Sequence, residues 1–91
     1  MNRPSLRQLR SRIDRLDRQL LRLLNQRAQL AVRVGALKRQ RRQPMFDPER
    51  EQLVLRQVTH ANHGPFSSRA LLRIFHAILR ESRRLEISTI K

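Results

Sequence analysis

The sequence contains no cysteine, tryptophan or tyrosine, and only two glycines and four prolines among its 91 residues. The lack of cysteine excludes disulfide bonds, thiol chemistry and cysteine-based zinc sites, and it fits a reducing compartment. The three phenylalanines lie far apart, which argues against a surface on which nucleic-acid bases stack. Neither an apolar leader nor a run of about 18 apolar residues occurs, so we expect no signal peptide, no membrane span and a cytoplasmic protein.

Positive charge is present in large excess. Lysine and arginine total 21 residues against 7 aspartates and glutamates, which gives a formal net charge of +14. Such a charge attracts nucleic acids, acidic membrane surfaces or small polyanionic metabolites. A basic, helical nucleic-acid-binding protein is therefore one hypothesis, and it predicts binding that weakens as the salt concentration rises.

Apolar residues recur through the first part of the chain at alternating steps of three and four. They are Leu6, Leu9, Ile13, Leu16, Leu20, Leu23, Leu30, Val34 and Leu37. This spacing predicts one long helix over about residues 5–42 with a single apolar stripe. Ser5 is a suitable cap for its first turn, and Pro44 ends it.

Two shorter helices are predicted to follow. The pair Asp47-Pro48 indicates a helix over about residues 48–61, because Asp caps exposed N–H groups and Pro suits the first helical position. The segment 62–65 is a break, after which Ser67 or Ser68 can cap a helix over about 67–87. The inward residues are expected to be Val54, Leu55, Val58 and Ala61, then Leu71, Phe75, Ile78 and Leu85. No segment alternates with period two, so the prediction is a single all-α domain over residues 1–91.

The first helix is too long for a compact subunit of this size. About 38 helical residues span about 57 Å, whereas the radius of gyration expected for a domain of this size is only about 12 Å. The apolar stripe must then extend beyond its own subunit, and a second copy of the chain is the simplest cover for it. We therefore expect an intertwined homodimer of three-helix subunits with exchanged first helices.

Cationic residues interrupt the stripe of the first helix. Continuing from Leu23, the next stripe position is Arg27, and Lys38 lies about three turns beyond it on the same side. The two cations could bracket a small anion. Arg10 lies about 25 Å from Arg27 along the helix axis, so it could reach such an anion only from the second subunit. The alternatives for Arg27 are a polar contact that sets the helix register or a buried ion pair. The alternative for Lys38 and Arg10 is an ordinary surface position.

The other two helices also carry polar residues at inward positions. Asp47 and Glu51 lie on successive turns of the second helix, and Ser82 and Glu86 form an i, i+4 pair in the third. Asp47 could instead act only as a helix cap. Glu51 could form an ion pair with a neighbouring arginine such as Arg50, and Ser82 could form a hydrogen bond to a backbone carbonyl of its own helix. Together these residues indicate a cation-rich pocket for a small dicarboxylate. Such a pocket does not suit nucleic acid, which binds to cations on the protein surface. No metal or cofactor site is expected.

Several runs of the sequence resemble the all-helical chorismate mutases. Those that resemble the first helix of the family are Leu9–Asp17, Leu20–Arg27 and Val34–Lys38. Phe46–Gln52 resembles the start of the second helix, and Asn62–Pro65, Ile74-Phe75 and Ser82–Glu86 resemble the third. The runs occur in order over nearly the whole chain.

This resemblance implies an intertwined dimer that converts chorismate to prephenate in the biosynthesis of phenylalanine and tyrosine. By position, Arg27 and Lys38 would hold the substrate carboxylates together with Arg10 of the second subunit. Lys38 and Glu86 would bond the ether oxygen of the C–O bond that breaks. The catalytic residues would then be Arg27, Lys38 and Glu86.

Four further positions would complete the binding site by the same resemblance. Asp47 and Glu51 would contact the ring hydroxyl, Ser82 would assist at a carboxylate, and Arg50 would support the site. The reaction would need no cofactor or metal. An isochorismate-pyruvate lyase, which has a related fold and makes salicylate, would use much the same residues and is the nearest alternative.

The residue at position 86 has a chemical consequence. Many relatives carry Gln at the position of Glu86 and others carry Glu. A carboxylate cannot donate a hydrogen bond to an ether oxygen, whereas a carboxylic acid can. We therefore expect Glu86 to act in its protonated form, so that activity falls as the pH rises.

Overall fold

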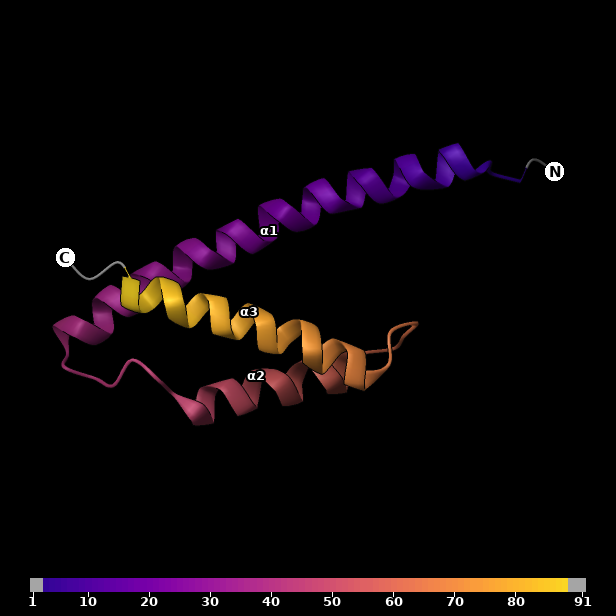
Figure 1. Cartoon of the computed structure of the whole chain (residues 1–91). Coiled ribbons are helices and arrows are strands. Elements are labelled where there is room, and N and C mark those ends of the chain that lie inside the picture. The colour runs from indigo at the N-terminus through magenta and orange to yellow at the C-terminus, as the bar shows by residue number, and fades with distance from the viewer. Residues whose placement is uncertain (1–2, 89–91) are drawn as a thin grey trace. The chain divides into compact units, whose positions relative to one another are not determined.

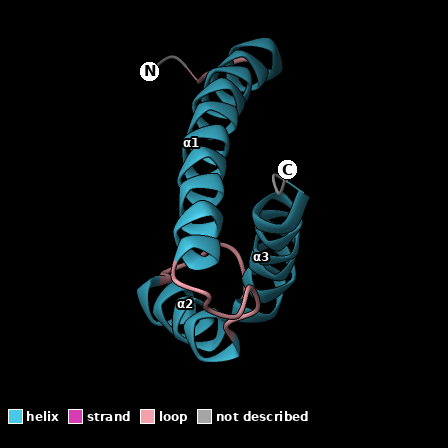
Figure 2. Ribbon diagram, turned by 90° about the vertical axis from the view of Figure 1, so that its left-hand side faces the viewer, coloured by secondary structure: helices cyan, strands magenta, loops and turns pink. Residues whose placement is uncertain are grey.

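The computed structural model describes residues 3–88 and contains three α-helices (Figure 1). They are α1 (Leu6–Gln40), α2 (Pro48–Ala61) and α3 (Ser68–Ser88). Every residue in this described range belongs to a helix or a loop in Figure 2, so the predicted all-α class is confirmed. None of these helices combines the length and the apolar content that crossing a membrane requires.

The chain divides into two compact units, residues 1–30 and residues 31–91. The first unit contains most of α1. The second contains the last turns of α1, the loop that follows, and the whole of α2 and α3.

The first unit is a capped amphipathic helix. Ser5 Oγ accepts a hydrogen bond from the Gln8 backbone N–H at 3.1 Å, and Gln8 Oε1 accepts one from the Ser5 N–H at 2.7 Å. This reciprocal pair satisfies two N–H groups of the first turn and confirms Ser5 as the cap. All the stripe residues of this unit are exposed: Leu6, Leu9, Ile13, Leu16, Leu20, Leu23 and Leu30.

The end of α1 is a two-bond C-terminal cap rather than a stop imposed by Pro44. The Gln43 N–H donates to the Lys38 carbonyl at 2.8 Å, and the Arg42 N–H donates to the Arg39 carbonyl at 3.1 Å. These are the two bonds of a Schellman motif. Arg42 takes the left-handed position with a φ of 55°, where glycine is the usual residue. The helix therefore ends at Gln40 rather than at the expected residue 42.

The starts of α2 and α3 follow from local sequence signals. Asp47 Oδ1 accepts the Arg50 backbone N–H at 3.0 Å, and Pro48 occupies the first turn of α2, as predicted. Of the two serines proposed as caps for α3, Ser67 is the one used, because its Oγ accepts the Ala70 N–H at 3.1 Å. Gly64, in the break between the helices, has a φ of 81°, which residues with a side chain rarely adopt.

The core of the second unit lies between α2 and α3. Its most buried apolar residues are Val54, Leu55 and Leu79, with Val58, Leu72 and Phe75 packed against them. Two expectations about this core need correction. Ala61 is exposed rather than inward, and Leu79, which was not expected, is more buried than the predicted residues of α3. The face of α3 that meets α2 is thus rotated slightly from the one that the apolar spacing indicated.

Candidate functional site

Lys38 and Glu86 form an ion pair inside the second unit. Lys38 Nζ lies 3.0 Å from Glu86 Oε1, although the two residues are 48 positions apart in the sequence. Their side chains are only 16% and 10% exposed. Among the described residues, Glu86 is the polar residue that falls in the buried class. A charged pair with so little access to water needs further hydrogen bonds to be tolerated.

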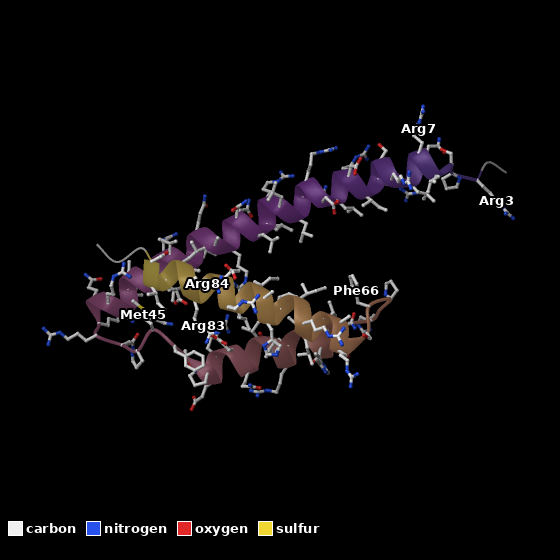
Figure 3. All side chains as sticks on the ribbon, in the orientation of Figure 1. Arg3, Arg7, Met45, Phe66, Arg83 and Arg84 are labelled. Atoms are coloured by element: carbon white, nitrogen blue, oxygen red, sulfur yellow. The ribbon has the colours of Figure 1, made fainter. Side chains whose placement is uncertain are left out.

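The loop after α1 supplies one of those bonds. Lys38 Nζ also donates to the backbone carbonyl of Met45 at 2.8 Å, and Figure 3 labels Met45 on this loop. An ammonium group has three N–H donors, and two of them are accounted for, one by Glu86 and one by Met45.

Glycine at position 35 explains how α1 and α3 come close enough for this pair. Gly35 is buried, and a Cβ atom built on it would lie 2.8 Å from Glu86 Cα and 2.9 Å from the Glu86 carbonyl oxygen. Real side chains essentially never pack at such distances. Arg39, four residues further along α1, donates from Nη1 to the same Glu86 carbonyl at 3.0 Å. Gly35, Lys38 and Arg39 thus meet Glu86 from one face of α1.

A second charged group lies where α2, α3 and the preceding loop meet. Arg83 Nε lies 3.4 Å from Glu51 Oε2, and the Arg83 guanidinium carbon is 4.7 Å from the centre of the Phe46 ring. Figure 3 labels Arg83 on α3. An arginine stacked on a ring while it holds a carboxylate is fixed in direction. The ion pair named as the alternative for Glu51 is present, with Arg83 rather than Arg50 as its partner.

The match to a known protein family covers nearly the whole chain. The family pattern described as chorismate mutase type II matches residues 9–87. The chain belongs to the chorismate mutase type II family. The resemblance found in the sequence is therefore confirmed.

Several bifunctional proteins contain a related segment. The bifunctional chorismate mutase/prephenate dehydratase of Aquifex aeolicus (strain VF5) is 40% identical over 78 residues, which cover 81% of this chain and 22% of that protein. The corresponding protein of Neisseria gonorrhoeae (strain ATCC 700825 / FA 1090) is 40% identical over 72 residues, which cover 79% of this chain and 19% of that protein. The chain thus spans about a fifth of the length of these curated relatives.

Solved chorismate mutase structures share the fold over almost their full length. Form II of the Thermus thermophilus chorismate mutase has a TM-score of 0.88 and 35% identity, covering 91% of this chain and 94% of that one. The Helicobacter pylori chorismate mutase in complex with prephenate has a TM-score of 0.83 and 26% identity, covering 94% and 97%.

Two of the residues that the family resemblance assigned to the site make local contacts. Asp47 is exposed and caps α2 through the Arg50 backbone, while the Arg50 side chain is itself exposed. Ser82 donates from Oγ to the Ile78 carbonyl of its own helix at 2.7 Å. These are the contacts named as alternatives for Asp47 and Ser82, and the roles of these residues and Arg50 toward a chorismate mutase substrate stay predictions.

The two arginines expected to bind carboxylates belong to the first unit. Arg10 is exposed on α1 and Arg27 is half-buried there. Their roles in a chorismate mutase site also stay predictions. Within residues 3–88, no cluster of three or more His, Cys, Asp and Glu side chains has a geometry that could hold a metal ion.

Three residues that contact the predicted site residues were not themselves predicted from the sequence. Gly35 and Arg39 contact Glu86, and Arg83 contacts Glu51. Gly35 carried a signal, because an isolated glycine within a helical run often marks a close approach of two backbones. Arg39 and Arg83 carried none, because a chain with 21 lysines and arginines offers no means of singling out one of them.

Proposed function

We propose that this chain is a chorismate mutase that rearranges chorismate to prephenate. The observation that carries the proposal is the nearly buried pair of Lys38 Nζ and Glu86 Oε1 at 3.0 Å, in a chain of the chorismate mutase type II family. The proposal concerns the mutase reaction alone, since the bifunctional relatives are matched over about a fifth of their length.

The chemistry of this pair suits a rearrangement within one molecule. In the reaction the ether C–O bond breaks while a C–C bond forms, and no atom is gained or lost. The site has to hold the substrate in its compact reactive form, which lowers the entropic part of the barrier. It also has to stabilise the negative charge that grows on the ether oxygen, which donors fixed in a dry site do well.

Lys38 and Glu86 are the proposed donors to that oxygen. Two N–H groups of Lys38 are assigned to Met45 and Glu86, so the third is the one proposed to meet the substrate. In the ion pair with Lys38, Glu86 is a carboxylate, so it would have to take up a proton before it could donate to that oxygen. Arg27 and Arg10 would hold the carboxylates, Asp47 and Glu51 the ring hydroxyl, and Ser82 would assist at a carboxylate with Arg50 as support.

The active species is proposed to be an intertwined homodimer, with Arg10 contributed by the second subunit and the long first helix extending across both. The exposed stripe of the first unit supports this proposal. Leu6, Leu16 and Leu23 are 62%, 61% and 60% exposed, and they repeat along one side of α1. A second copy of the same stripe is the natural cover for such a face.

Product identification tests the proposed reaction directly. The purified protein is incubated with chorismate and, in a separate reaction, with isochorismate, and the products are identified by chromatography. We expect prephenate from chorismate. Salicylate and pyruvate from isochorismate, with no prephenate from chorismate, would instead identify the isochorismate-pyruvate lyase.

Substitution of Arg27 separates an enzyme from a nucleic-acid-binding protein. Arg27→Ala is expected to abolish turnover while the dimer persists in light scattering, because it removes a carboxylate-binding group. Arg33→Ala is the matched control, since Arg33 is an exposed arginine of the same helix. Salt-sensitive retention of DNA that survives Arg27→Ala, in a protein without turnover, would favour the nucleic-acid hypothesis.

A further inference from the structure

The C-terminal end of α3 is held by a side chain from another helix. Glu86 lies in the last turn of α3, which ends at Ser88. Arg39 Nη1 donates to the Glu86 carbonyl at 3.0 Å. A cation at this end of a helix also interacts favourably with the helix dipole.

The same residue is contacted at its backbone and at its side chain. Gly35 packs against Glu86 Cα and its carbonyl, Arg39 bonds the carbonyl, and Lys38 Nζ pairs with the carboxylate. The two backbone contacts fix the position of Glu86 Cα, and the ion pair fixes the position of the carboxyl group. Movement of the helix end would therefore carry the carboxyl group away from Lys38.

We propose that Arg39 is a positioning residue for the reaction, acting through the backbone of Glu86. The proposal rests on the proposed mutase function. Arg39 bonds the peptide oxygen of Glu86, whereas Lys38 bonds its carboxyl group. Catalysis is sensitive to such placement, because an error of about 1 Å at a reacting group can lower the rate about 100-fold.

The geometry also explains why arginine suits this position better than lysine. A guanidinium group is planar and keeps its donors in a fixed fork, so one N–H aimed at a carbonyl also fixes the orientation of the group. A lysine at position 39 would keep the charge at the helix end but would lose that directional constraint. It should therefore rescue the function only in part.

The first experiment compares Arg39→Gln, Arg39→Lys and Arg33→Gln by steady-state kinetics with chorismate. We expect Arg39→Gln to lower kcat about tenfold with KM changed less than about threefold, because Glu86 is misplaced in the transition state. Arg39→Lys should recover part of kcat. Arg33→Gln, which removes the same charge from an exposed site on α1, should leave both constants near those of the wild type.

The second experiment asks whether Arg39 acts through Glu86. In a double-mutant cycle, Arg39→Gln should have almost no further effect on kcat once Glu86→Ala has removed the carboxyl group that Arg39 positions. Thermal unfolding of each variant shows that it is folded at the assay temperature. If Arg39→Gln does not fold, the cycle is run with Arg39→Lys.

The outcomes separate this inference from the function on which it rests. A wild-type protein that makes no prephenate overturns the proposed function itself. An active wild type with an unchanged Arg39→Gln variant overturns the positioning role alone. An equal loss of kcat from Arg39→Gln with and without Glu86 overturns it too, because that result identifies a purely structural contact.

Discussion

Substitution of Gly35 by alanine tests whether the close approach of α1 to α3 sets the position of Glu86. In an exposed helix interior this change would stabilise the protein by about 1 kcal/mol, because alanine has the higher helix propensity. At position 35 the new Cβ would lie 2.8 Å from Glu86 Cα, whereas ordinary contacts begin at 3.4 Å. The Glu86 backbone would have to retreat by about 0.6 Å, the difference between these two distances.

The size of this displacement sets the expected effect on the reaction. A misplacement of about 1 Å can lower a rate about 100-fold, so a retreat of about 0.6 Å should lower kcat at least about tenfold. Overpacking of this kind typically destabilises a fold by about 1–3 kcal/mol. With the helix-propensity gain subtracted, we expect a loss of stability of no more than about 2 kcal/mol.

The assay measures kcat with chorismate and the free energy of unfolding by denaturant titration. The matched control is Ala36→Gly, which makes the reverse change at the adjacent exposed position. It should lower stability by about 1 kcal/mol and leave kcat unchanged. A Gly35→Ala variant that is more stable than the wild type and equally active would refute the argument that this contact positions Glu86.

Two further predictions follow from charge and backbone geometry. Arg42→Gly should raise the free energy of unfolding by about 0.5–1 kcal/mol, because Arg42 occupies a left-handed position with a φ of 55°. A urea titration measures this change, and a destabilised variant would be inconsistent with that conformation. Finally, kcat/KM for the dianionic substrate should decrease from low to physiological ionic strength, because salt screens the net charge of +14, and a flat profile would show that the surplus charge does not attract substrate.

The structural features that the sequence predicted correctly depend on neighbouring residues. Asp47 and Pro48 specify the start of α2 within one turn, and Ser5 and Ser67 do the same for α1 and α3. The end of α1 was less predictable, because the left-handed residue of its cap is Arg42 rather than glycine. An arginine at position 42 does not indicate a turn, and Pro44 is the nearest stop signal in the sequence.

The features that could not be predicted depend on how helices pack. Apolar spacing indicates that α3 has an inward face, but the packing against α2 decides that Leu79 lies deeper than Leu71 or Ile78. The ion pairs show the same limit. The alternative for Glu51 was an ion pair with a neighbouring arginine, and the choice of Arg83 depends on the approach of α3 to α2, which no local pattern records.

The loop after α1 connects this local structure to the proposed chemistry. The cap of α1 turns the chain at Arg42, and the segment that follows brings the Met45 carbonyl to within 2.8 Å of Lys38 Nζ. Lys38 also supplies the carbonyl that accepts the Gln43 N–H in that cap, so the same residue closes the helix and contacts the loop that follows it.

This arrangement prepares Lys38 before any substrate binds. Its ammonium group is directed by a backbone carbonyl on the loop and by Glu86 on α3, so its remaining N–H has little choice of direction. A donor that is already oriented needs no reorganisation when charge develops on the ether oxygen, and this is the condition under which an electrostatic contact lowers a barrier most. The buried pair therefore orients the charge of Lys38 rather than adding to the stability of the fold. Removing two such charges from water costs about as much free energy as their attraction returns.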